Sequence, residues 1–168
     1  MSRRFFELAD DMSLPHRWDL DAPTDSQGLK LDDGQFKLGT PVHIKERLKI
    51  AVEIAGKPLL MELAPDDVQL LPVDVAGQTD PYFILVATRL IRCIDEQRSR
   101  VRRWTQEDGL PDMVGQYASV RDMRIDKSTV GNAQVFRPDE WFVSLIVSEE
   151  IKDALDRMGA TGTRFEEV

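Results

Sequence analysis

The sequence is poor in cysteine and histidine: Cys93 is the only cysteine, and His16 and His43 are the only histidines. A single cysteine cannot form an intramolecular disulfide or a cysteine-based zinc site. The two histidines stand in no recognisable ligand spacing. Long apolar runs are missing as well, and the longest, Tyr82 to Ala87, is far too short to cross a bilayer. The sequence therefore predicts no metal site, no cofactor and no membrane-spanning helix.

Positive charge is also scarce, because 22 lysines and arginines stand against 30 aspartates and glutamates in 168 residues. The formal net charge of −8 argues against nucleic acid and anionic membranes as partners, since both bind cationic surfaces. An acidic surface suits a basic protein partner, which it can steer electrostatically. The N-terminal residues show no apolar segment of the secretory type, so a cytoplasmic location is expected.

The composition, 42% apolar and 31% charged, is typical of a globular protein, and the length predicts one domain over residues 1–168. Turn residues dominate the first third of the chain. They indicate a loop-rich β part over about residues 1–65, ahead of an α+β part over about residues 66–168.

Apolar residues alternate with polar ones along several segments, as in strands with one buried face. The clearest alternation predicts a β-hairpin formed by residues 47–54 and 59–63. Residues 68–75 predict a strand that Pro72, which lacks an amide donor, confines to an edge or a bulge. Residues 82–94 fit a buried strand or a helix, and we favour a strand that runs into an irregular turn. The remaining predicted strands are residues 123–125 and the central strand 141–147.

The clearest predicted helix covers about residues 148–158, near the C-terminus. Ser148 is a suitable N-cap, and the apolar residues from Ile151 to Met158 follow the i, i+3, i+4, i+7 spacing of one buried stripe. A short strand centred on Phe165 follows. The fold class predicted is α+β: mainly antiparallel β-sheet with a C-terminal amphipathic helix and a final short strand.

The sequence shows no nucleophile, base and phosphate loop in a catalytic pattern, so we expect no enzyme. Cys93 lies in an apolar run and is expected in the core. The run Arg98 to Arg103, followed by Trp104, resembles a nucleic-acid footprint. Acidic neighbours such as Glu96 and Asp108 favour the other interpretation, in which these arginines pair with carboxylates.

The C-terminal third carries the segments VGNAQVFRP at 130–138 and LIVSEEIK at 145–152, with Trp141 between them and Gly159, Gly162 and Phe165 after them. With DVQLLPV at 67–73 and YFIL at 82–85, this pattern resembles the predicted immunity proteins of bacterial polymorphic toxin systems, of the myxobacterial type. The resemblance implies a protein that binds and neutralises a cognate toxin, encoded next to it, by occluding the toxin without catalysis.

No binding residue follows from the resemblance position by position. If the toxin is a basic nuclease, carboxylates would imitate its phosphate substrate. The candidate contact residues form an N-terminal group and a group in the loop beside Trp104: Asp10, Asp11, Asp19, Asp21, Asp32 and Asp33, and Trp104 with Glu107, Asp108 and Asp112.

Two alternatives from other classes stay open. The first is an enzyme that acts on a toxin product or a small molecule through carboxylates that only the fold brings together, which a pocket with two facing acids and a strongly shifted pKa would favour. The second is a nucleic-acid or small-molecule binder that uses Arg98 to Arg103. A homodimer also stays open.

Overall fold

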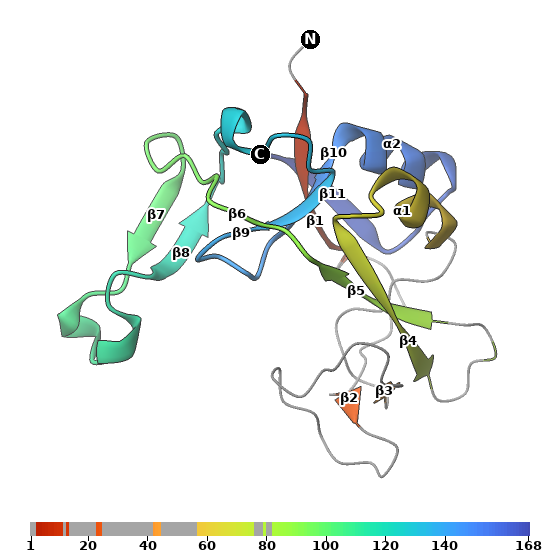
Figure 1. Ribbon diagram of the computed structural model, residues 1–168. Helices are drawn as coiled ribbons and strands as arrows, with labels where there is room; N and C mark the ends of the chain where they lie inside the picture. The colour runs from red at the N-terminus through yellow and green to blue at the C-terminus, as the bar shows by residue number, and fades with distance from the viewer. Residues whose placement is uncertain are drawn as a thin grey trace.

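The computed structural model describes residues 3–11, 13, 23–24, 42–44, 57–75, 79 and 82–168. Two sheets, a two-stranded arm and two helices make up this part of the chain (Figure 1). In chain order the elements are β1 (Phe5–Asp10), β2 (Pro23–Thr24), β3 (Val42–Ile44), α1 (Lys57–Leu63), β4 (Val68–Val75), β5 (Tyr82–Ala87), β6 (Leu90–Ile91), β7 (Arg100–Arg103), β8 (Tyr117–Arg121), β9 (Val135–Pro138), β10 (Leu145–Ser148), α2 (Glu149–Arg157) and β11 (Thr163–Glu167).

The larger sheet has the strand order β11-β1-β10-β9-β6, and only its β6–β9 pair is parallel. Neighbouring residues on its strands are buried on opposite faces, because side chains alternate along a strand. Phe5, Phe136 and Ile146 enter one hydrophobic cluster, whereas Phe6 and Val147 enter the other. The near-continuous apolar sequence of β10 therefore reflects a central strand with both faces covered, as predicted.

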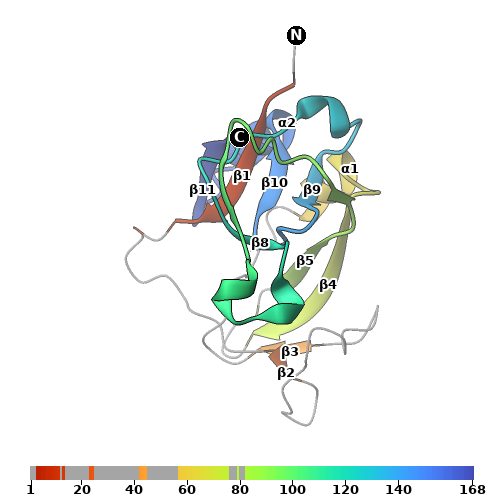
Figure 2. The same ribbon diagram turned by 90° about the vertical axis from the view of Figure 1, so that its left-hand side faces the viewer.

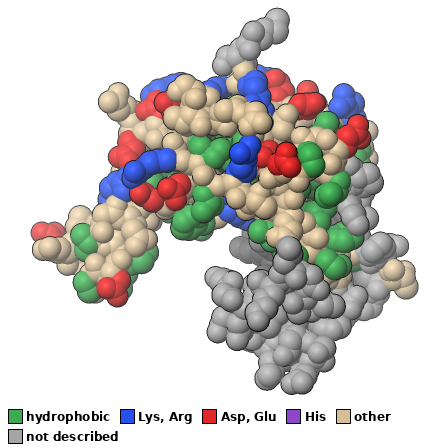
Figure 3. Space-filling model, viewed as in Figure 1, with side chains coloured by type: hydrophobic (Ala, Val, Ile, Leu, Met, Phe, Trp, Pro, Cys, Tyr) green, Lys and Arg blue, Asp and Glu red, His purple; other side chains and the backbone are tan. Residues whose placement is uncertain are grey.

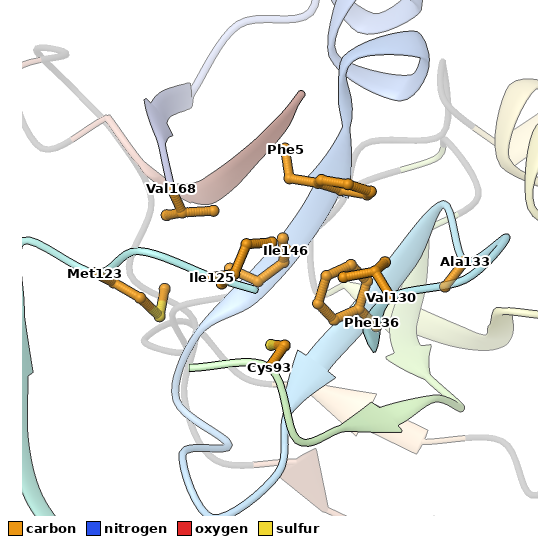
Figure 4. Close-up of a cluster of buried hydrophobic side chains, with 9 residues drawn as sticks. All are labelled: Phe5, Cys93, Met123, Ile125, Val130, Ala133, Phe136, Ile146 and Val168. Carbon is orange, nitrogen blue, oxygen red and sulfur yellow. The ribbon is translucent and has the colours of Figure 1, made fainter. Parts of the chain in front are cut away.

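The first cluster closes one face of this sheet with residues from the loops around it (Figure 4). The rings of Phe5 and Phe136 meet edge to face with centroids 5.8 Å apart, and the Cys93 side chain lies among them. Cys93 is buried, as predicted, and burial raises the pKa of its thiol to about 12.

Helices α1 and α2 cover the other face with the second cluster. Ser148 caps α2 by accepting a hydrogen bond from the Ile151 amide at 3.3 Å, and Ile151, Ala154 and Leu155 are buried, which confirms the predicted C-terminal helix. Gly159 follows it with a φ of 71°, the left-handed conformation that glycine adopts without strain after a helix. The predicted final strand is β11.

The hairpin predicted from residues 47–54 and 59–63 is wrong in its second half. Residues 57–63 form α1, and residues 47–54 lie outside the described residues. The alternation of Leu59, Met61 and Leu63 suggested a strand, but the buried pair is Leu60 and Ala64, four residues apart on one helix face. Met61 stays exposed. Packing against α2 and β4 thus decides this segment in favour of a helix.

The second sheet has the order β2-β3-β4-β5, with a parallel β3–β4 pair between two antiparallel pairs. Strand β4 is the predicted strand 68–75, but the prediction that Pro72 confines it to an edge or a bulge is wrong, because β4 lies between β3 and β5 and pairs with β5 in regular register. Pro72 stands just before the residues Val73 to Val75 that pair with β3. Asp67, at the start of β4, ties this sheet to the larger one. Its buried carboxylate accepts hydrogen bonds from the amides of Gln134 and Val135, at 2.6 and 3.3 Å.

The strand predicted at residues 123–125 is wrong. Strand β8 ends at Arg121, because Asp122 has a left-handed φ of 46° that breaks the ladder, and Ile125 forms only an isolated bridge with Ile94. The predicted strand 141–147 begins at Leu145. The residues before it form a loop that turns twice.

Candidate functional site

The most distinctive surface of the described residues is an arm, defined here as residues 100–121, that projects from the two sheets (Figures 1 and 2). Strands β7 and β8 form it as an antiparallel pair, with Arg100 opposite Arg121 and Val101 opposite Val120. At its base the Ser99 hydroxyl donates to the Arg124 carbonyl at 3.2 Å and accepts from the Arg124 amide at 2.9 Å.

The end of the arm, residues 104–116 (the arm tip), folds through two short 3₁₀ turns, Gln106–Asp108 and Pro111–Met113. A capping hydrogen bond holds the first turn: the Asp108 carboxylate accepts from the Thr105 amide at 2.8 Å. Gly115 takes a φ of 89° and its amide donates to the Trp104 carbonyl at 2.9 Å, which closes the tip.

The arm tip presents apolar and acidic side chains side by side (Figure 3). Leu110 is 47% exposed and Val114 is 42% exposed. Trp104 is half-buried beneath the guanidinium of Arg102, whose central carbon lies 4.9 Å from the ring centroid. Large exposed apolar side chains that cluster at one place are a common feature of interaction surfaces.

The carboxylates of the tip differ in whether they form hydrogen bonds and ion pairs within the protein. Asp108 caps the turn and binds Arg102 at 2.9 Å, and these hydrogen bonds lower its pKa. Glu107 and Asp112 are exposed, and neither forms an ion pair with the described part of the chain. The structure therefore brings all four loop candidates together on one tip, where two of the carboxylates form no ion pair with the described residues.

The N-terminal candidate residues are only partly within the described residues. Asp10 ends β1, where its backbone pairs with Thr163. Asp11 accepts hydrogen bonds from the amide and hydroxyl of Ser13, at 3.0 and 2.6 Å, and these bonds lower its pKa. The other four candidates lie outside the described residues: Asp19, Asp21, Asp32 and Asp33.

Arg103 fixes the arm to the body. Its guanidinium binds Glu96 at 2.6 Å and Glu140 at 3.3 Å, and it donates to the Gly115 carbonyl. It also stacks on the Tyr117 ring, 4.1 Å from the centroid. Burial and the hydrogen bond to Glu96 raise the pKa of Tyr117 to about 12. The sequence pointed to pairing for this arginine, but could not identify Glu140 as a partner because 37 residues separate the two.

The other arginines of the run are paired as well. Arg102 binds Asp108, Arg100 binds Asp122, and Arg98 lies 4.0 Å from Asp95. The interpretation that these arginines pair with nearby carboxylates is therefore confirmed.

The described residues contain no cluster of three or more histidine, cysteine, aspartate or glutamate residues that could hold a metal ion. Every carboxylate of this part with a resolved pKa shift is shifted downward, mainly by hydrogen-bond donors, as in Glu96 and Glu167. No helix among these residues has the length and apolar character needed to pass through a bilayer.

The described residues thus define a β-rich protein whose distinctive feature is a projecting, partly apolar surface. The chain belongs to the immunity protein family (Imm11), whose profile matches residues 57–168. The match covers the arm, both helices and the strands from β4 to β11, and it confirms the family resemblance. No curated protein matches the sequence.

Proposed function

We propose that this protein protects its cell by binding a cognate toxin in the cytoplasm and occluding it without catalysis, as a single domain over residues 1–168. Membership of the immunity protein family is the observation that carries this proposal. The arm tip supplies the contact surface, because it projects from the body and combines exposed apolar groups with two carboxylates free of ion pairs in the described chain.

The chemistry of the tip suits a toxin with a basic active-site cleft. Glu107 and Asp112 would meet cationic groups that otherwise bind a phosphate substrate, and the net charge of −8 would steer the two proteins together. Leu110 and Val114 would exclude water from the contact. The hydrogen bonds that close the tip and the ion pairs of Arg103 hold the arm in place. Binding therefore costs little conformational entropy.

Co-expression with the product of the adjacent open reading frame tests this function. We expect the protein to protect cells from that product and to co-purify with it. Protection without a complex would contradict occlusion and favour an enzyme that acts on the toxin's product. Absence of both complex and protection would contradict the proposed function altogether.

Charge reversal tests the arm tip. The double variant Glu107→Lys/Asp112→Lys is expected to slow association by about tenfold at low salt, since rim charges act mainly on the association rate. Glu62→Lys/Glu166→Lys is the matched control, because both residues are exposed acids outside the arm and the change in net charge is identical. Equal slowing by both double variants would show that only the net charge matters and would remove the tip from the proposal.

A further inference from the structure

The loop between β9 and β10, residues 139–144, presents two large apolar side chains to solvent. Phe142 is 55% exposed and Val143 is 76% exposed, and both lie in its second turn. Turns at the ends of hairpins are usually built from glycine, asparagine, aspartate, proline or serine. Turn formation alone does not require two neighbouring apolar residues here, and their side chains remain exposed to solvent.

Three contacts hold this loop in one conformation. The Arg137 guanidinium, whose pKa burial lowers, donates to the Phe142 carbonyl at 2.6 Å. The buried Ser144 hydroxyl donates to the Glu7 carboxylate at 2.6 Å. Trp141 packs against the first hydrophobic cluster. The loop thus turns Trp141 inward and presents the next two residues outward on a fixed backbone.

Glu140, in the first turn of the loop, carries backbone strain. Its φ of 65° lies in the left-handed region, which is unfavourable for a residue with a side chain. Ion pairs with Arg92 at 2.6 Å and with Arg103 at 3.3 Å hold it there. Strained residues that their surroundings maintain in this way cluster at ligand clamps and functional sites.

The same ion pair places the loop beside the arm. Arg103 binds Glu140 of the loop and the Gly115 carbonyl of the arm tip. In Figure 3 hydrophobic side chains lie on the flank of the body next to the base of the arm, with a notch between body and arm. A partner that spans this notch would contact both the arm tip and the loop.

We propose that Phe142 and Val143 form an apolar anchor that inserts into a pocket of the toxin, and that the arm tip contacts the same molecule. This inference rests on the proposed function. The carboxylate of Asp139 in the same loop and the net charge of −8 indicate a pocket with a basic rim. An apolar centre within a charged rim is the usual anatomy of a tight protein interface.

The two surfaces have separate kinetic roles. Desolvated apolar anchors act mainly on the dissociation rate, whereas rim charges act mainly on the association rate. The variant Phe142→Ser/Val143→Ser is therefore expected to leave association near its original rate and to accelerate dissociation by about tenfold or more. Its thermal unfolding is expected to stay close to that of the unaltered protein, because both side chains are exposed.

The experiment measures the association and dissociation rates of binding to the adjacent gene product. That product carries an inactivated active site and is immobilised on a surface. Met61→Ser/Met158→Ser is the matched control, since these exposed apolar residues lie on α1 and just after α2, outside the loop and the arm. Faster dissociation of the loop variant alone supports the anchor. Unchanged dissociation overturns the anchor and leaves the proposed function standing.

Two further outcomes are distinguishable. If the unaltered protein does not bind the gene product, the proposed function fails, and the anchor fails with it. If sedimentation shows that the unaltered protein is a dimer and the loop variant a monomer, while toxin binding is unchanged, the occupant of the loop is a second copy of this chain. That result also overturns the proposal.

Discussion

Removal of the Asp67 carboxylate is expected to destabilise the whole fold, because this group joins the two sheets. It accepts from the amides of Gln134 and Val135 and from the Arg89 guanidinium, at 2.6, 3.3 and 2.8 Å, and its side chain is only 6% exposed. In Asp67→Ala two amides at the start of β9 lose their acceptor, at a cost of about 1–3 kcal/mol each. Arg89 is partly exposed, so the loss of its ion pair with Asp67 adds little to the destabilisation.

The expected loss is about 3 kcal/mol, which corresponds to a fall in Tm of about 6–12 °C for a chain of this length. Differential scanning calorimetry and urea titration measure it. Asp66→Ala is the matched control, because the neighbouring residue is exposed and is expected to change stability by no more than about 0.5 kcal/mol. Equal Tm values for the two variants would refute the role given to Asp67.

Three further perturbations test other parts of the structure. Ser148→Ala removes the N-cap of α2 and should cost about 1 kcal/mol in urea unfolding, whereas an unchanged midpoint would contradict the capping bond to Ile151. Cys93, whose pKa burial raises to about 12, should react with a thiol reagent at neutral pH only as fast as the protein unfolds, and rapid labelling of the native protein would contradict its burial. Hydrogen bonds from Arg103 and Tyr117 hold the pKa of Glu96 below its usual 4.5, so this group stabilises the fold above that value and its contribution disappears as the pH falls below it. Tm measured against pH should therefore fall less steeply on the acid side for Glu96→Gln, and identical profiles would refute this assignment.

Elements specified by local interactions could be predicted from the sequence. The cap and apolar stripe of α2 are contained within a few neighbouring residues. Strand β10 is apolar at most positions because both of its faces are buried, and this pattern is visible without the structure. The four loop candidates lie together for the same reason, since one tip contains them.

Features that depend on distant residues could not be predicted. The Leu59–Leu63 segment alternates like a strand, but packing on α2 and β4 makes it a helix. Asp67 gains its amide donors from a segment 67 residues away. Phe142 and Val143 read as part of a buried strand, but the left-handed turn at Glu140 places them in an exposed loop, and this turn depends on ion pairs with Arg92 and Arg103.

A titration of toxin activity tests the central claim most directly. The purified protein is added in steps to a fixed amount of the adjacent gene product, and the remaining toxic activity is measured at each step. Occlusion predicts a linear fall that ends at a fixed stoichiometric ratio and does not deepen with time. Complete loss of activity at a small fraction of that ratio, progressing with time, would show turnover and contradict the account.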